Sequence, residues 1–181
     1  MIETPYGLVS IDNIARAQKI KLLISDVDGV FSDGLIYMGN NGEELKTFHT
    51  KDGFGIKAIL HFGIDVAIIT GRQSKIVETR MMGLGIKHIY QATENKLTVY
   101  QSLLKTLNLT AQQVAYIGDD VVDLAIIQDC GLGVAVKDAH PLVLQGADLI
   151  TTTKGGYGAV REVCDLLLQC QQKLNITHGK S

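Results

Sequence analysis

Two aspartates that could take part in chemistry, Asp26 and Asp28, are separated by one residue at the end of an apolar run and stand directly before Gly29. In an extended chain, residues i and i+2 point to the same side, so both carboxylates should project together from a buried strand over residues 20–25. Open parallel sheets bind ligands at the carboxyl ends of their strands. The pair therefore predicts a reactive site at such an edge.

A second acidic cluster, made of Asp119, Asp120 and Asp123, follows another apolar run at residues 114–118. If both strands belong to one parallel sheet, these carboxylates meet the first pair. Two unit charges about 4 Å apart repel by roughly 4 kcal/mol at an effective dielectric constant near ~20. We therefore expect a bound cation, and oxygen ligands at a site that also handles phosphate favour Mg²⁺ over Ca²⁺.

The composition predicts a compact enzyme formed by one domain over residues 1–181, with 46% hydrophobic residues. A net charge of −2 gives no basic footprint for nucleic acid. Apolar stretches stay well below the roughly 18 residues of a membrane span. Cys130, Cys164 and Cys170 show no metal-binding or paired spacing, which favours thiols in a reducing compartment and a cytoplasmic location.

Strand and helix patterns alternate along the chain. The apolar runs predict strands at 20–25, 66–70, 88–91, 114–118, 132–136 and 148–151. Helical spacing and capping residues predict helices after Ser10, near 56–60, and at 74–82, 95–107, 122–128 and 159–173. This alternation predicts an α/β fold with three layers, in which helices cover both faces of a mostly parallel sheet.

A segment at about 35–48 breaks the alternation and reads as a small β-hairpin with its turn at Asn41 and Gly42. An isolated two-stranded ribbon is marginal in water. The hairpin is therefore expected either to pack against the body or against copies of itself in an oligomer, or to form a solvent-exposed flap.

Four ordered motifs now carry a resemblance. They are residues 26–30, the tripeptide 70–72, Lys96 and residues 118–123. In order and spacing they resemble the motifs of the haloacid dehalogenase-like phosphatase superfamily, whose fold is Rossmann-like. An Asp-x-Asp sequence alone is weak, but four elements in order, each at a strand end or helix start, are specific.

Further features resemble one family within this superfamily. A hairpin in place of a cap domain, together with residues 49–57 and 155–162, resembles the family of 3-deoxy-D-manno-octulosonate 8-phosphate phosphatases over nearly the whole chain. That family implies a cytoplasmic, Mg²⁺-dependent homotetramer that makes free 3-deoxy-D-manno-octulosonate for lipopolysaccharide. It also implies that the hairpins surround the tetramer axis and that a neighbour's C-terminal segment helps to close each site.

Catalytic roles follow from the motif positions. Asp26 would attack phosphorus and form an aspartyl-phosphate, and Asp28 would protonate the leaving oxygen and then activate water. Thr70 would offer its hydroxyl and its backbone N–H to the phosphoryl oxygens, while Lys96 supplies fixed positive charge. These four residues are the predicted catalytic set.

The predicted Mg²⁺ ligands are the Asp26 side chain, the Asp28 backbone carbonyl and the Asp119 side chain, completed by waters and a phosphate oxygen. Asp120 and Asp123 have two interpretations. They either position Lys96 or metal-bound waters, or serve as an N-cap and a first-turn acid of the following helix.

A sugar acid phosphate carries a carboxylate, so further basic residues are expected near the site. In the resembling family, matching positions contact substrate, and Lys51 stands where arginine is common. These predicted substrate-binding residues are Asp28, His49, Thr50, Lys51, Asp52, Gly53, Lys57, Arg72, Arg80 and Lys96.

Three alternatives remain open. The substrate could be a related nine-carbon sugar acid 9-phosphate, since such relatives share the capless fold. A phosphoacceptor receiver domain also combines acids, Thr and Lys around Mg²⁺, but its acceptor follows a later strand than its acidic pair. A non-catalytic oligomeric scaffold would not need the intact catalytic set.

Overall fold

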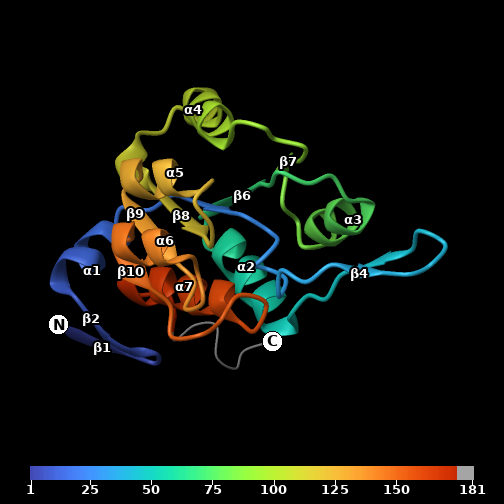
Figure 1. Cartoon of the computed structure of the whole chain (residues 1–181). Coiled ribbons are helices and arrows are strands. Elements are labelled where there is room, and N and C mark those ends of the chain that lie inside the picture. Colours follow the sequence, from blue (N-terminus) through green and yellow to red (C-terminus); the bar gives the residue numbers. More distant parts are fainter. Residues whose placement is uncertain (175–181) are drawn as a thin grey trace.

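The computed structural model describes residues 1–174, and its centre is a six-stranded parallel sheet (Figure 1). The sheet runs in the order β10-β9-β8-β3-β6-β7. Its strands are β3 (Leu22–Ser25), β6 (Asp65–Ile69), β7 (His88–Tyr90), β8 (Val114–Gly118), β9 (Leu132–Ala135) and β10 (Leu149–Ile150). The parallel sheet predicted from the alternation is confirmed.

Helices cover both faces of this sheet, as the layer prediction requires (Figure 1). The helices are α1 (Ile11–Ala17), α2 (Thr50–His61), α3 (Lys75–Gly83), α4 (Lys96–Leu107), α5 (Leu124–Asp129), α6 (Pro141–Gly146) and α7 (Ala159–Cys170). Helices α1 and α2 pack against α7 on one face, and α4 and α6 pack against α5 on the other. Every residue of β3, β8 and β9 is buried, because both faces are covered.

Along the chain, β3 is the first strand of this sheet. β6 and β7 follow and lie on one side of it, and β8, β9 and β10 lie on its other side. The strand order therefore reverses beside β3, between β3 and β8. In open α/β sheets the crevice at such a reversal is where ligands bind.

An N-terminal hairpin of β1 (Ile2–Thr4) and β2 (Gly7–Val9) was not predicted from the sequence. Each strand has three residues, of which two are exposed, so the pattern is too short for a periodicity signal. The hairpin is held to the body by the Tyr6 hydroxyl, which donates to Asp165 at 2.8 Å.

Three helix predictions need correction. Helix α2 begins at Thr50 and not near residue 56, because the His49 ring nitrogen accepts the Lys51 N–H at 3.1 Å and caps the helix. Helix α6 was missed, although its N-terminal turn starts with Pro141, a residue suited to that position. Helix α7 ends at Cys170 and not at residue 173.

The predicted hairpin is confirmed as β4 (Tyr37–Met38) paired antiparallel with β5 (Glu44–Leu45), and it extends away from the body (Figure 1). Its turn contains Gly42 with φ of +87°, a conformation that glycine adopts without a steric penalty. Side chains alternate across an extended strand, so Leu45 faces away from Glu44.

No helix within residues 1–174 is long and apolar enough to cross a bilayer. Cys130, Cys164 and Cys170 are buried free thiols. The C-terminal tail, to which the family's neighbour-closing segment would correspond, is residues 175–181 and lies outside the described residues.

A buried carboxylate lies between α2 and α7. Asp52, in the first turn of α2, is 1% exposed and accepts the backbone N–H of Arg161, in the first turn of α7, at 2.8 Å. Because Gly158 at the N-cap of α7 has no side chain to accept this bond, Asp52 caps that helix from its neighbour. Its second oxygen, Oδ2, is buried without a hydrogen-bond partner among the described residues.

Burial raises the pKa of Asp52 to about 6, although the Arg161 N–H and the charges of Arg161 and Arg80 act in the opposite direction. In the unfolded chain the value is about 3.9. The folded protein therefore binds this proton more tightly. The resulting stabilisation is complete below about pH 4 and is lost as the pH rises through about 6.

We predict that Asp52→Asn removes this pH dependence, because the amide keeps an acceptor for the Arg161 N–H and does not titrate. Urea unfolding should show the stability of the wild type relative to the variant falling by on the order of 2 kcal/mol between about pH 4 and 7. A difference that is constant over this range would contradict the assignment.

Candidate active site

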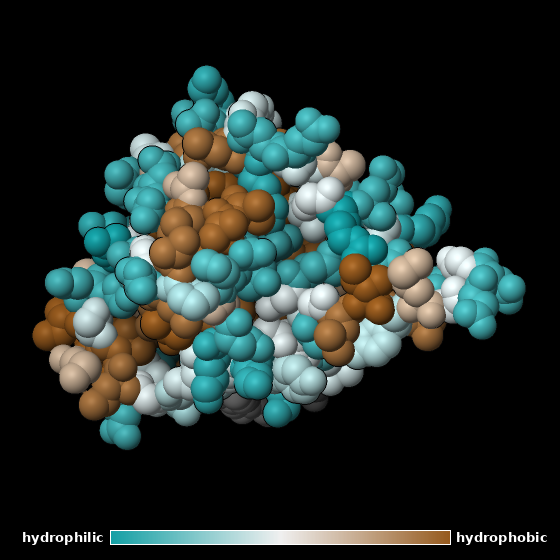
Figure 2. Space-filling model, in the orientation of Figure 1, coloured by the Kyte–Doolittle hydropathy of each residue, from teal (hydrophilic) through white to brown (hydrophobic). Residues whose placement is uncertain are grey.

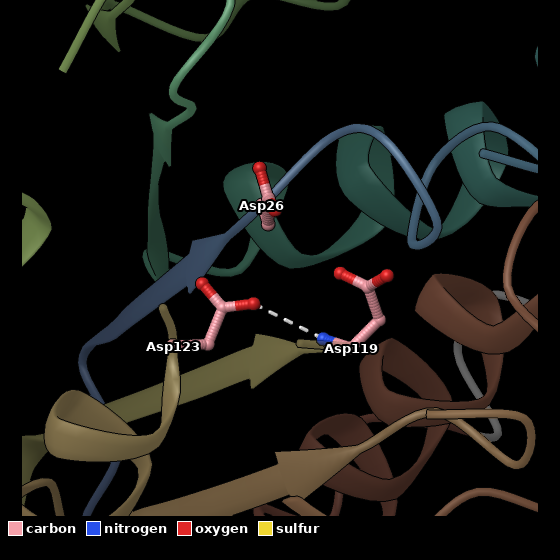
Figure 3. A group of neighbouring side chains, drawn as sticks. All are labelled: Asp26, Asp119 and Asp123. Carbon is pink, nitrogen blue, oxygen red and sulfur yellow. Dashed lines mark hydrogen bonds between the residues drawn. The ribbon is translucent and has the colours of Figure 1, made fainter. Parts of the chain in front are cut away.

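Neighbouring strands bring the two acidic motifs together. β3 pairs in parallel with β8, with Ser25 opposite Ile117, and the Asp26 N–H donates to the Ile117 carbonyl at 3.1 Å. Asp26 follows β3 and Asp119 follows β8, so both lie at the carboxyl edge where the strand order reverses (Figure 3). The expectation that the acidic clusters meet at one sheet edge is confirmed.

Lys96 lies between two of these acids. It is 6% exposed, and its Nζ is 2.8 Å from Asp26 Oδ2 and 2.7 Å from Asp123 Oδ1. Lys96 is the first residue of α4, and Asn95 caps that helix by accepting the Thr98 N–H at 3.1 Å. The helix start thus fixes the backbone from which this ammonium reaches the acids.

Asp123 organises the acidic loop. Its fully buried carboxylate accepts from Lys96 at 2.7 Å, from the Tyr116 hydroxyl at 2.6 Å, and from the backbone N–H groups of Asp119 and Asp120 at 3.1 and 3.3 Å. The hydrogen bond from the Asp119 N–H to Asp123 is the dashed line in Figure 3. Of the two interpretations of Asp123, the geometry agrees with the one that positions Lys96.

Asp120 behaves differently from Asp123. Its carboxylate accepts the N–H of Val121 at 2.7 Å, and no contact with Lys96 is found for it within residues 1–174. Helix α5 begins at Leu124, with Asp123 at its N-cap position, so Asp120 is not the N-cap residue. Asp120 lines the pocket above the sheet edge.

The carboxylates are arranged for a cation. Burial is the main cause that raises the pKa of Asp119 to about 8, and the negative charges of Asp26 and Asp123 raise it further. Burial also raises the pKa of Asp26 to about 6, although Lys96 opposes this. A divalent cation would offset both effects by neutralising the two carboxylates.

A buried acceptor marks the place for that cation. Asp119 Oδ1 has no hydrogen-bond partner among the described residues. One carboxylate oxygen each from Asp26, Asp119 and Asp123 lies within 4.8 Å of the others. Asp119, which keeps an oxygen without a partner, is therefore the clearest metal ligand of the three, and the oxygen donor set that it forms with Asp26 suits Mg²⁺.

Gly29 makes the close approach of the loops possible. It has φ of +88°, and a Cβ atom at this position would collide with the Asp119 carboxylate. Gly155, in the loop after β10, likewise lies so close to the Gly29 carbonyl that a Cβ would overlap it. The collision at position 29 explains why glycine directly follows the Asp-x-Asp motif.

Thr70 directly follows β6 at the same edge and is 2% exposed. Its backbone N–H donates to the Tyr90 carbonyl at 2.9 Å, which is part of the pairing between β6 and β7. The prediction that this N–H is offered to a phosphoryl oxygen is therefore wrong, because the sheet already uses it. The hydroxyl remains as the polar group that Thr70 presents to the pocket.

A pocket of about 490 Å³ opens over this edge. Its lining includes the catalytic candidates Asp26, Asp28, Thr70 and Lys96, together with Asp119. Of the predicted substrate-binding residues, it contains Asp28, Arg72 and Lys96. The structure does not place the others in its lining; they are His49, Thr50, Lys51, Asp52, Gly53, Lys57 and Arg80.

Those other residues have different surroundings. Lys57 lines a separate pocket of about 410 Å³ with Asp65, at the opposite end of β6. The Arg80 guanidinium lies 6.0 Å from the Phe48 ring, beside the start of α2. His49 and Asp52 act within the structure as caps of α2 and α7.

Two residues of the site were missed by the sequence analysis. Lys46 comes from the hairpin and forms an ion pair with Asp28. Tyr116 lies in β8 and donates its hydroxyl to Asp123. The available signals were a tyrosine inside an otherwise apolar buried strand, whose hydroxyl needs a partner, and the i, i+2 spacing of Glu44 and Lys46, which puts both charges on one face of the hairpin.

Comparisons with known proteins agree with this geometry. Residues 82–163 match the family model of the haloacid dehalogenase-like hydrolases. The chain is 56% identical over 180 residues to 3-deoxy-D-manno-octulosonate 8-phosphate phosphatase of Escherichia coli strain K12, covering 99% of this chain and 96% of that protein.

Solved structures are similar over the same extent. The phosphatase of that name from Yersinia pestis superposes with a TM-score of 0.95 at 57% identity, covering 96% of this chain and 94% of that one. The one from Moraxella catarrhalis, solved with magnesium, phosphate and KDO, has a TM-score of 0.90 at 42% identity and covers 91% of this chain and 95% of that one.

Sequence identity and structural similarity thus extend over almost the whole chain. It belongs to the haloacid dehalogenase-like hydrolases and, within them, to the family of 3-deoxy-D-manno-octulosonate 8-phosphate phosphatases.

Proposed function

We propose that this protein hydrolyses 3-deoxy-D-manno-octulosonate 8-phosphate to the free sugar acid and phosphate, with Mg²⁺, in lipopolysaccharide biosynthesis. The observation that carries the proposal is the buried Lys96, which is paired with Asp26 at 2.8 Å in a pocket that also contains Asp28, Thr70 and Asp119. The pocket thus combines a nucleophile, an acid and fixed positive charge, which phosphate ester hydrolysis requires. The names and bound groups of the similar proteins support the same substrate.

In the proposed reaction, the Asp26 carboxylate attacks phosphorus, and the bond from phosphorus to the sugar oxygen breaks as Asp28 gives that oxygen a proton. This step leaves an aspartyl-phosphate and the free sugar acid. Asp28 then takes a proton from a water molecule, which attacks the same phosphorus and releases phosphate and the Asp26 carboxylate. Lys96 and the Thr70 hydroxyl hold the phosphoryl oxygens throughout.

Mg²⁺ would be held by the Asp26 and Asp119 side chains and by the Asp28 backbone carbonyl. When bound, it supplies positive charge that lowers the repulsion between the anionic nucleophile and the anionic phosphate. Asp123 contributes by keeping Lys96 and the Asp119 backbone in place. Asp120, in the pocket lining, would hold a metal-bound water.

Substrate recognition is proposed to depend on Arg72, which lines the pocket and has a half-exposed guanidinium that can meet the sugar carboxylate. His49, Thr50, Lys51, Gly53, Lys57 and Arg80 lie outside the pocket lining, so a role for them in binding would depend on a neighbouring subunit or on movement. A nine-carbon sugar acid phosphate is the alternative substrate, and the names of the similar proteins favour the eight-carbon ester.

We also propose that the chain works in the cytoplasm as a single domain and assembles into a homotetramer through its hairpin. Leu35, Ile36, Met38 and Leu45 are 58% to 75% exposed on this small element. Figure 2 shows the apolar surface that they contribute where the hairpin leaves the body. An exposed apolar ribbon of this kind is stabilised by packing against copies of itself.

The substrate assignment predicts a clear order of activities. Phosphate release should be fastest with 3-deoxy-D-manno-octulosonate 8-phosphate, slower with a nine-carbon sugar acid 9-phosphate and with an aryl phosphate, and absent with a chelator. Preference for the nine-carbon ester would keep the mechanism and change the substrate. Absence of release from every ester in Mg²⁺ would reject the phosphatase assignment.

Asp26→Asn is predicted to abolish turnover while preserving the fold, because the amide cannot form the aspartyl-phosphate and Lys96 keeps its bond to Asp123. Borohydride trapping of the acyl-phosphate should label the wild type alone. Circular dichroism serves as the control for folding. Measurable turnover by a correctly folded variant would remove Asp26 from the nucleophile role.

Leu45→Glu is predicted to break the assembly, since it places a charge on the apolar side of the hairpin that faces away from Glu44. Sedimentation velocity should show a smaller species, with an unchanged circular dichroism spectrum. Met82→Glu is the matched control, because Met82 is a similarly exposed apolar residue on α3. If Leu45→Glu sediments like the wild type, this side of the hairpin is not the assembly surface.

A further inference from the structure

A lysine from the hairpin reaches into the active site. The Lys46 side chain is 2% exposed, and its ammonium forms an ion pair with Asp28 Oδ1 and lies 3.8 Å from Glu44 Oε1. By contrast, Leu45 points to the other face of the ribbon, together with its cross-strand partner Tyr37, and is 69% exposed. The hairpin therefore has one side turned toward the catalytic loop and another turned toward solvent.

Withdrawing an ammonium from water is costly unless it is paired, and Lys46 has two carboxylates beside it, Asp28 and Glu44. Glu44 can therefore balance the charge of Lys46 while Asp28 carries a proton on Oδ2 and still accepts from Lys46 through Oδ1. Asp28 also accepts a hydrogen bond from the Ser32 hydroxyl at 3.4 Å. Within residues 1–174, both contacts are made with Oδ1 of Asp28. One oxygen is therefore anchored, which leaves Oδ2 for a reacting group in the pocket that Asp28 lines.

We propose that Lys46 is a positioning residue of the phosphatase reaction. By holding Oδ1 of Asp28, it fixes the orientation in which Oδ2 exchanges a proton with the leaving-group oxygen. The inference rests on the proposed acid role of Asp28 and assigns the hairpin a part in catalysis besides assembly. Small errors in the placement of a catalytic group lower the reaction rate strongly, so a carboxylate held in one orientation favours catalysis.

The same side of the hairpin restrains a second pocket residue. Glu44 accepts a hydrogen bond from the Arg72 guanidinium at 3.0 Å. A row of alternating charges therefore runs from Asp28 through Lys46 and Glu44 to Arg72, and it joins the loops after β3 and β6 to the hairpin. Both the proposed acid and the proposed carboxylate-binding arginine are thus held by Lys46 and Glu44 at the end of the hairpin.

A purely structural ion pair would also look like this, so the test must report on proton donation. Phenyl phosphate and p-nitrophenyl phosphate have similar size and lack a sugar carboxylate. They differ in the leaving group, since p-nitrophenolate leaves readily without a proton and phenolate gains more from one. Their kcat/KM values report on the step in which the phosphate ester bond breaks.

We expect Lys46→Met, in the full-length enzyme with Mg²⁺, to lower kcat/KM for phenyl phosphate about ten-fold more than for p-nitrophenyl phosphate. Lys46→Arg should recover part of this difference, because it restores a cation beside Asp28. Lys105→Met, at an exposed lysine on α4, is the matched control and should behave like the wild type.

Asp28→Asn is measured beside them as the reference for loss of the acid. If Asp28→Asn shows the leaving-group difference and Lys46→Met lowers both substrates equally or leaves both unchanged, the positioning role of Lys46 is overturned. If Asp28→Asn itself shows no difference, the acid assignment in the proposed function fails, and the inference about Lys46 fails with it.

Discussion

The site depends on the neutralisation of buried carboxylates that the sheet gathers at one edge. Asp26, Asp119 and Asp123 lie within a few ångströms of one another, and Lys96 compensates part of their charge by pairing with two of them. The remaining imbalance appears as the raised pKa of Asp119, about 8, and its unpartnered Oδ1. A divalent cation would complete this balance, because the repulsion among the buried carboxylates favours cation binding, and the cation together with Lys96 would then attract the phosphate.

Backbone topology supplies the positions of these charges. The strand order reverses beside β3, so the loops after β3 and β8 open at the same crevice. Gly29 lets the Asp119 carboxylate approach the first loop more closely than any side chain would permit. Buried hydrogen bonds from Tyr116 and two backbone N–H groups then hold Asp123, which in turn holds Lys96. The reactive groups therefore lie directly after buried strands or at a helix start, where these hydrogen bonds hold them.

The hairpin links assembly to the site. One of its sides exposes Leu45 and its cross-strand partner Tyr37, which suits contact with other subunits, while Glu44 and Lys46 on the other side contact Arg72 and Asp28. Strand alternation makes this division possible, because neighbouring residues point in opposite directions. In a chain without a cap domain, such a ribbon can organise the entrance of the pocket with few residues.

The sequence by itself determined the alternating fold, the hairpin and the residues at the sheet edge, because apolar runs, turn glycines and ordered acidic motifs are local signals. Short elements such as β1, β2 and α6 were not predicted from the sequence, because three to six residues show too little periodicity. Tertiary structure alone decided that Asp123 holds Lys96, that Asp52 caps α7, that the Thr70 N–H belongs to the sheet, and that Lys46 reaches Asp28. Each of these contacts joins residues from different elements, and their burial and partners are set by packing that no local pattern encodes.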